Sequence, residues 1–122
     1  MARILVIEDE NHIRTLLSKL LEQKGYEVLT ATNGKEGLRV LHANLLIDVI
    51  VTDIFMPEKE GLETIKEIKK EFPDVKIIAI SGGGHKGNMS FLTIAKHIGA
   101  NTALKKPFSI EDLSNAIKAL IQ

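Results

Sequence analysis

The chain has 122 residues and no cysteine, and its 16 Lys and Arg residues balance 16 Asp and Glu residues. This composition excludes disulfides, thiolate metal sites and a cysteine nucleophile, and it predicts no direct attraction to nucleic acid or to an anionic membrane. The apolar run at residues 4–7 is too short for a signal peptide or a membrane span, so we expect one cytoplasmic domain over residues 1–122.

Short apolar runs rich in β-branched residues alternate along the chain with segments of helical periodicity. In chain order, the predicted strands cover residues 4–7, 28–31, 49–51, 77–80 and 102–105. The predicted helices follow these strands around residues 13–21, 36–41, 62–68, 91–98 and 110–120. A strand followed by a helix, repeated along the chain, predicts an α/β fold in which helices cover a parallel sheet through right-handed crossovers.

Residues that end or begin helices support these boundaries. Gly25 is placed to close the first helix, and Asn33 with Gly34 predicts a turn after the second strand. Ser109 and Asp112 have the spacing of a capping box, which predicts that the last helix begins at this point.

Polar residues follow the predicted strands at the edge of the sheet where α/β proteins bind ligands. Glu8 and Asp9 follow the first strand, Asp53 follows the third, Ser81 the fourth and Lys106 the fifth. Each residue alone has an ordinary explanation, such as an acid near a helix start, a turn residue or a surface lysine. Their common position at one edge favours a functional site.

Two of these acids, Asp9 and Asp53, follow strands that we expect to be neighbours. Strands in a sheet lie about 4.8 Å apart. At roughly 5 Å and an effective dielectric constant of about 20, two carboxylates repel by about 3 kcal/mol, which is about two pKa units. Both groups therefore stay largely ionised at neutral pH. We expect a bound Mg²⁺ ion, rather than protonation, to offset the repulsion, because Mg²⁺ accepts one or two carboxylates and keeps several waters.

Sequence motifs at the strand ends resemble those of the receiver domain of two-component response regulators. The motifs are VIEDE, VTDIFMPEKEG, ISG, AKHIGA and KKPF, in this order along the whole chain. The resemblance implies a flavodoxin-like, doubly wound, five-stranded parallel sheet with strand order 2-1-3-4-5 and helices on both faces. It also implies a single-domain response regulator, a signalling protein that catalyses only its own phosphorylation and dephosphorylation.

The resemblance assigns a role to each acid of the site. Asp53 is the expected phosphoacceptor, which takes a phosphoryl group from the phosphohistidine of a sensor histidine kinase or phosphotransfer protein. Asp9, Asp53 and the main-chain carbonyl of Phe55 are the expected Mg²⁺ ligands, and Glu8 is expected to act through a bound water.

The resemblance also assigns roles around the phosphoryl group and on the surface. Lys106 is expected to offset the charge of the phosphoryl group, and the peptide bond between Lys106 and Pro107 is expected to be cis. The Ser81 hydroxyl and the Gly82 amide are expected to bind its oxygens. A downstream target protein is expected on the face formed by the fourth helix, the fifth strand and the fifth helix.

A glycine-rich run, ISGGGHKGN at residues 80–88, matches the spacing G-x-G-x-x-G. It follows the fourth strand rather than the first and lacks the Lys-Ser or Lys-Thr pair of a Walker loop, so a nucleotide is not the expected ligand. We expect the start of this run to contact instead the phosphoryl group carried by Asp53. Because Ala103 stands where the family usually has an aromatic residue, we expect residues 82–88 to form a lid that transmits the signal instead.

Other functions remain open at this stage. A protein-binding module that no longer takes phosphate is one, and Ala103 favours it. An aspartyl-phosphate phosphatase is another, although relatives of the haloacid dehalogenases carry a second Asp where this chain has Phe55. A flavodoxin-like electron carrier is disfavoured because the chain has one Tyr and no Trp.

Overall fold

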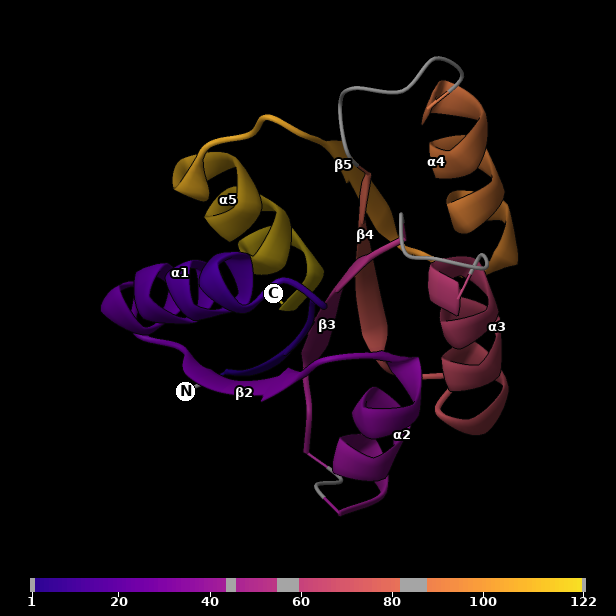
Figure 1. Ribbon diagram of the computed structural model, residues 1–122, viewed down its shortest axis with the longest axis horizontal. Coiled ribbons are helices and arrows are strands. Elements are labelled where there is room, and N and C mark those ends of the chain that lie inside the picture. The colour runs from indigo at the N-terminus through magenta and orange to yellow at the C-terminus, as the bar shows by residue number, and fades with distance from the viewer. Residues whose placement is uncertain (1, 44–45, 55–59, 82–87, 122) are drawn as a thin grey trace.

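The computed structural model describes residues 2–43, 46–54, 60–81 and 88–121 (Figure 1). The strands are β1 (Arg3–Ile7), β2 (Glu27–Ala31), β3 (Val49–Asp53), β4 (Lys76–Ser81) and β5 (Thr102–Lys105). The helices are α1 (Asn11–Gln23), α2 (Gly34–Ala43), α3 (Glu60–Glu71), α4 (Asn88–Ile98) and α5 (Ile110–Ile121). All the strand pairings are parallel and the strand order is β2-β1-β3-β4-β5, which confirms the expected fold.

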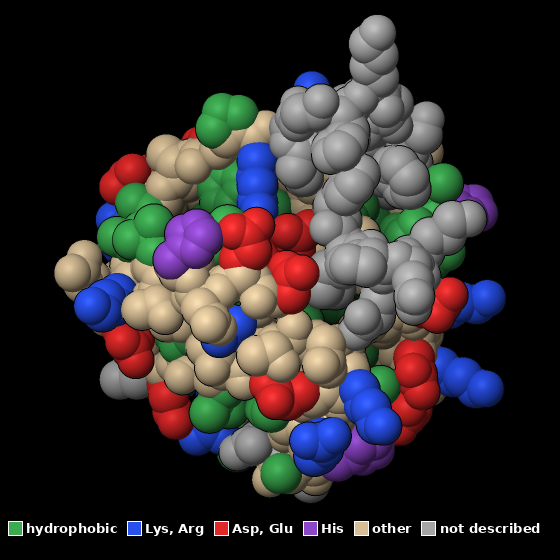
Figure 2. All heavy atoms as spheres, viewed as in Figure 1, with side chains coloured by type: hydrophobic (Ala, Val, Ile, Leu, Met, Phe, Trp, Pro, Cys, Tyr) green, Lys and Arg blue, Asp and Glu red, His purple; other side chains and the backbone are tan. Residues whose placement is uncertain are grey.

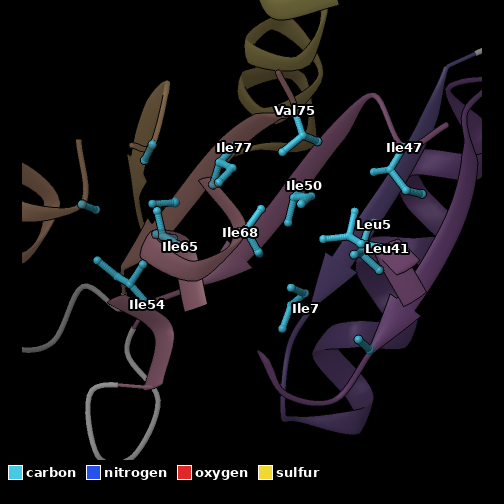
Figure 3. Close-up of a cluster of buried hydrophobic side chains, with 14 residues drawn as sticks. Leu5, Ile7, Leu41, Ile47, Ile50, Ile54, Ile65, Ile68, Val75 and Ile77 are labelled. Atoms are coloured by element: carbon cyan, nitrogen blue, oxygen red, sulfur yellow. The ribbon is translucent and has the colours of Figure 1, made fainter. Parts of the chain in front are cut away.

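Helices cover both faces of the sheet, with α1 and α5 on one face and α2, α3 and α4 on the other (Figure 1). Successive strand residues point to opposite faces, so each apolar run supplies two cores. Ile4 and Val6 pack with α1 and α5, whereas Leu5 and Ile7 pack with α2 and α3 (Figure 3). Burial on both faces explains why these strands are continuous apolar runs without alternation.

The strand register brings the predicted site residues to one edge of the sheet. Asp53 at the end of β3 pairs with Ile80, and Ser81 at the end of β4 pairs with Lys105. The strand order reverses between β1 and β3, and the ligand crevice of an open α/β sheet lies beyond the carboxyl ends of strands at such a point.

Two of the predicted helix boundaries are confirmed by hydrogen bonds or dihedral angles. Gly25 follows α1 with a φ of 97°, a left-handed conformation that suits glycine. At the start of α5 the Asp112 N–H donates to Ser109 Oγ (3.0 Å), and the Ser109 N–H donates to Asp112 Oδ2 (3.2 Å).

Two other boundaries differ from the prediction. Asn33 is the N-cap of α2, since its Oδ1 accepts the Glu36 N–H at 2.8 Å, and Gly34 is already helical. The predicted turn at these residues was therefore a helix start. Helix α4 begins at Asn88, earlier than the predicted residue 91, because Met89 is the only apolar residue among positions 88–90 and a single residue carries no periodicity. Among the described residues, no helix has the length and apolar character needed to cross a membrane.

Candidate functional site

The two buried carboxylates of the site come from neighbouring strands. Glu8 directly follows β1 and is 3% exposed, and Asp53 ends β3 and is 7% exposed. The Glu8 N–H donates to the Ala31 carbonyl of β2 at 3.0 Å, which extends the sheet pairing to this residue. Asp9, the next acid along the chain, is exposed, although its carboxyl group hydrogen-bonds that of Glu8. The structure therefore brings these acids together but buries Glu8 and leaves Asp9 at the rim.

Lys106 contacts both buried acids. Its Nζ lies 3.2 Å from Asp53 Oδ2 and 3.9 Å from Glu8 Oε1. The Lys106 N–H donates to the Ser81 carbonyl at 2.9 Å, so the residue is tied to the end of β4, and its peptide bond to Pro107 is cis as expected. Lys105, the lysine that precedes Lys106 in the chain, is exposed at the end of β5.

The surroundings of Glu8 raise its pKa from 4.5 to about 7. Burial is the largest cause, and the negative charge of Asp53 and the hydrogen bond with Asp9 act in the same direction. The Glu10 N–H, which donates to Glu8 Oε2 at 3.1 Å, and the Lys106 ammonium lower the pKa. The sequence argument considered only repulsion between carboxylates, whereas in the structure desolvation is the larger effect.

The donor set of the site fits a magnesium ion. The carboxyl groups of Glu8, Asp9 and Asp53 supply oxygens, which Mg²⁺ prefers, and their charge exceeds that of Lys106. Within the described part of the chain, no group of three or more His, Cys, Asp or Glu residues could hold a metal by itself. Mg²⁺ typically takes one or two carboxylates and completes its shell with water, a main-chain carbonyl or a phosphate oxygen. Acidic side chains gather near the middle of the face drawn in Figure 2, beside a basic side chain.

The remaining predicted site features are Ser81, Phe55, Gly82 and the lid. Ser81 is fully buried at the end of β4, one residue beyond the partner of Asp53 in the sheet. Phe55 and Gly82 lie outside the described residues, as does most of the predicted lid at residues 82–88. Their roles stay predictions.

Arg14 supports the site, and the sequence analysis did not identify it. Its Nη1 donates to the main-chain carbonyl of Glu8 at 2.8 Å, and its own N–H donates to the Glu10 carbonyl at 2.9 Å. Both bonds fasten the turn that carries the acids to α1. The sequence shows only that Arg14 follows the acidic run by one helical turn. This spacing is too common to predict that Arg14 holds the turn in place.

An apolar groove adjoins the site. It has a volume of about 570 Å³ and lies between α1 and the segment that follows β5. Leu16 of α1, which is 57% exposed, lines it together with Phe108 and Lys106. Lys106 therefore belongs both to the groove and to the acidic site.

The response regulator receiver domain family matches residues 4–118. The chain belongs to this family. The receiver domain is 33% identical over 122 residues to the transcriptional regulatory protein CpxR homolog of Haemophilus influenzae, covering 100% of this chain and 51% of that protein. It is 33% identical over 121 residues to the response regulator SaeR of Staphylococcus aureus, covering 99% of this chain and 51% of SaeR.

Solved structures support the same family. A response regulator receiver domain protein from Clostridium thermocellum is 41% identical, with a TM-score of 0.91 and coverage of 99% of this chain and 94% of the other. The response regulator TrrA from Thermotoga maritima, in complex with Mg²⁺ and BeF, is 36% identical, with a TM-score of 0.84 and coverage of 99% and 100%. The receiver domain therefore functions in two-component signalling, and it spans about half the length of the curated relatives it matches.

Proposed function

We propose that Asp53 of this receiver domain accepts a phosphoryl group from the phosphohistidine of a sensor histidine kinase or a phosphotransfer protein. The observation that carries the proposal is the placement of Asp53: its carboxylate is 7% exposed, and its Oδ2 lies 3.2 Å from the Lys106 ammonium. Phosphoryl transfer depends mainly on positioning and on charge stabilisation, and this arrangement supplies both for an incoming phosphate.

In the proposed reaction a carboxylate oxygen of Asp53 attacks the phosphorus atom. An oxygen–phosphorus bond forms while the phosphorus–nitrogen bond to the donor histidine breaks, and the imidazole keeps the electron pair and takes a proton. Lys106 offsets the charge on the transferring group, and the Ser81 hydroxyl donates to a phosphoryl oxygen of the product. The Gly82 amide is proposed as a second donor.

We propose Asp9, Asp53 and the Phe55 carbonyl as the residues that hold Mg²⁺, with Glu8 acting through a water. The bound ion would supply positive charge for the phosphoryl oxygens. The burial of the Glu8 and Asp53 carboxyl groups supports this assignment, because it leaves their negative charge poorly solvated.

Protein partners are proposed on two surfaces. The apolar groove beside Lys106 would receive the phosphoryl donor, since a protein bound there lies next to Asp53. A downstream target would bind the face of α4, β5 and α5. The CpxR homolog is named as a transcriptional regulatory protein, and we propose only protein partners for the receiver domain itself.

The test is incubation with acetyl phosphate and Mg²⁺, followed by mass spectrometry. We expect one added phosphoryl group that hydroxylamine removes, as it does from acyl phosphates, and no addition to the Asp53→Asn variant. Asp74→Asn, at an exposed carboxylate near the opposite ends of the strands, is the matched control and should be modified normally. Modification that persists in Asp53→Asn would contradict the assignment, and an unmodified wild type would favour a binding module without phosphate.

A further inference from the structure

Gly61 lies at the start of α3 and contacts the main chain of the proposed phosphoacceptor. A Cβ atom built at Gly61 would lie 2.4 Å from Ile54 Cα and 2.8 Å from both the Asp53 carbonyl oxygen and the Ile54 carbonyl carbon. All three are main-chain atoms, so no side-chain rotation can relieve the overlap. Any side chain at Gly61 must move either α3 or the end of β3.

The segment that Gly61 contacts is also held from the other side. The Ile54 N–H donates to the Ile80 carbonyl of β4 at 2.8 Å, and the Thr52 hydroxyl donates to the Asp53 carbonyl at 3.3 Å. The Ile54 side chain is buried in the same cluster as Ile65 of α3 (Figure 3). The main chain directly after Asp53 is therefore fixed between β4 and α3.

We infer that Gly61 is a positioning residue for phosphoryl transfer, an inference that rests on the proposed role of Asp53. Moving a Cβ from 2.4 Å to the 3.4 Å at which ordinary contact begins requires a displacement of about 1 Å. A misplacement of about 1 Å at reacting groups lowers a rate by as much as roughly 100-fold. The close approach of α3 thus sets where the Asp53 carboxylate meets the phosphorus atom.

Gly37 in α2 provides a matched control. A Cβ at Gly37 would lie 2.6 Å from Ile7 Cδ1 and 3.1 Å from Ile7 Cγ1, which are side-chain atoms that can shift without moving the main chain. Both glycines are buried and helical, and neither has a positive φ, so replacement by alanine does not force a left-handed residue at either site. The two variants differ in whether the new methyl group meets main chain or a side chain.

The experiment compares wild type, Gly61→Ala and Gly37→Ala by amide hydrogen exchange and by phosphorylation with acetyl phosphate and Mg²⁺. In Gly61→Ala we expect exchange of the Ile54 amide to be at least about tenfold faster than in Gly37→Ala, because its bond to Ile80 is disturbed. We expect the maximum phosphorylation rate to fall by about 10- to 100-fold, with little change in the acetyl phosphate concentration that gives half of that rate. Gly37→Ala should stay within about threefold of wild type.

Several outcomes would overturn the inference. One is that Gly61→Ala reacts as fast as wild type. Another is that Gly37→Ala loses as much activity as Gly61→Ala does, because an equal loss would point to general destabilisation. Both variants are also measured in sucrose, which favours the folded state, and failure of Gly61→Ala to fold there would assign Gly61 to folding rather than to positioning. A wild type that takes no phosphoryl group would instead refute the proposed function, and the Gly61 inference with it.

Discussion

Replacing Glu8 by Gln is expected to stabilise the metal-free protein at pH 8 and to change its stability little at pH 4. Burial, chiefly, raises the pKa of Glu8 from 4.5 to about 7, so the folded state holds this proton more tightly than the unfolded state does. The contribution of Glu8 to the free energy of unfolding is therefore fully present below pH 4.5 and is lost as the pH rises through 7. Because one pKa unit corresponds to about 1.4 kcal/mol, the total loss is roughly 3 kcal/mol.

Gln keeps an oxygen that can accept the Glu10 N–H, now donated to Glu8 Oε2 at 3.1 Å, but it carries no charge. At pH 4 the wild-type side chain is itself mostly protonated, so the two proteins should then be similar in stability. At pH 8 the variant should be more stable by about 3 kcal/mol, because it avoids burying a carboxylate.

The assay is urea unfolding in EDTA at a series of pH values from 4 to 8, with the free energy of unfolding compared at each pH. Glu10→Gln is the control: its side chain is 56% exposed, so its stability should stay within about 0.5 kcal/mol of wild type at every pH. Groups that do not interact with Glu8 titrate alike in both proteins and cancel in the difference between them. A difference between Glu8→Gln and wild type that does not change with pH would refute the reasoning.

Three further substitutions test the site and the fold. Asp9→Ala should weaken Mg²⁺ binding more than tenfold in calorimetry, since about 1.4 kcal/mol is a factor of ten and a carboxylate ligand should exceed it; equal affinities would count against the metal site. Ser114→Ala should raise the free energy of unfolding by about 1 kcal/mol, because this hydroxyl is buried without a hydrogen-bond partner among the described residues; a loss of stability would contradict this. Asn33→Ala should cost about 1 kcal/mol in urea unfolding by removing the cap that accepts the Glu36 N–H, and an unchanged midpoint would show that the cap contributes little.

Much of the fold was predictable from the sequence because its signals are local. The apolar run at β1 predicts a strand buried on both faces, and Ile4 and Leu5 indeed pack in different cores. The capping box of Ser109 and Asp112 could be predicted because both partners lie within one helical turn. Asn33 was misinterpreted because the same residue type favours turns and helix caps, and the side chain alone does not distinguish them.

The sequence also predicted which residues gather at the site. In a parallel sheet every strand ends at the same edge, so Glu8, Asp53 and Lys106 could be grouped once the strands were recognised. The family motifs then supplied the strand order, which periodicity leaves open. The 3.2 Å contact between Lys106 and Asp53 agrees with that grouping.

Only the tertiary structure decided how the grouped residues share the site. It buries Glu8 while Asp9 stays exposed, although the two are adjacent acids in the sequence, and it thereby raises the pKa of Glu8. It also brings Arg14 to the Glu8 carbonyl and Gly61 to the Asp53 main chain. Desolvation and close contact depend on atoms contributed by distant segments, and the local sequence pattern contains no information about their distances.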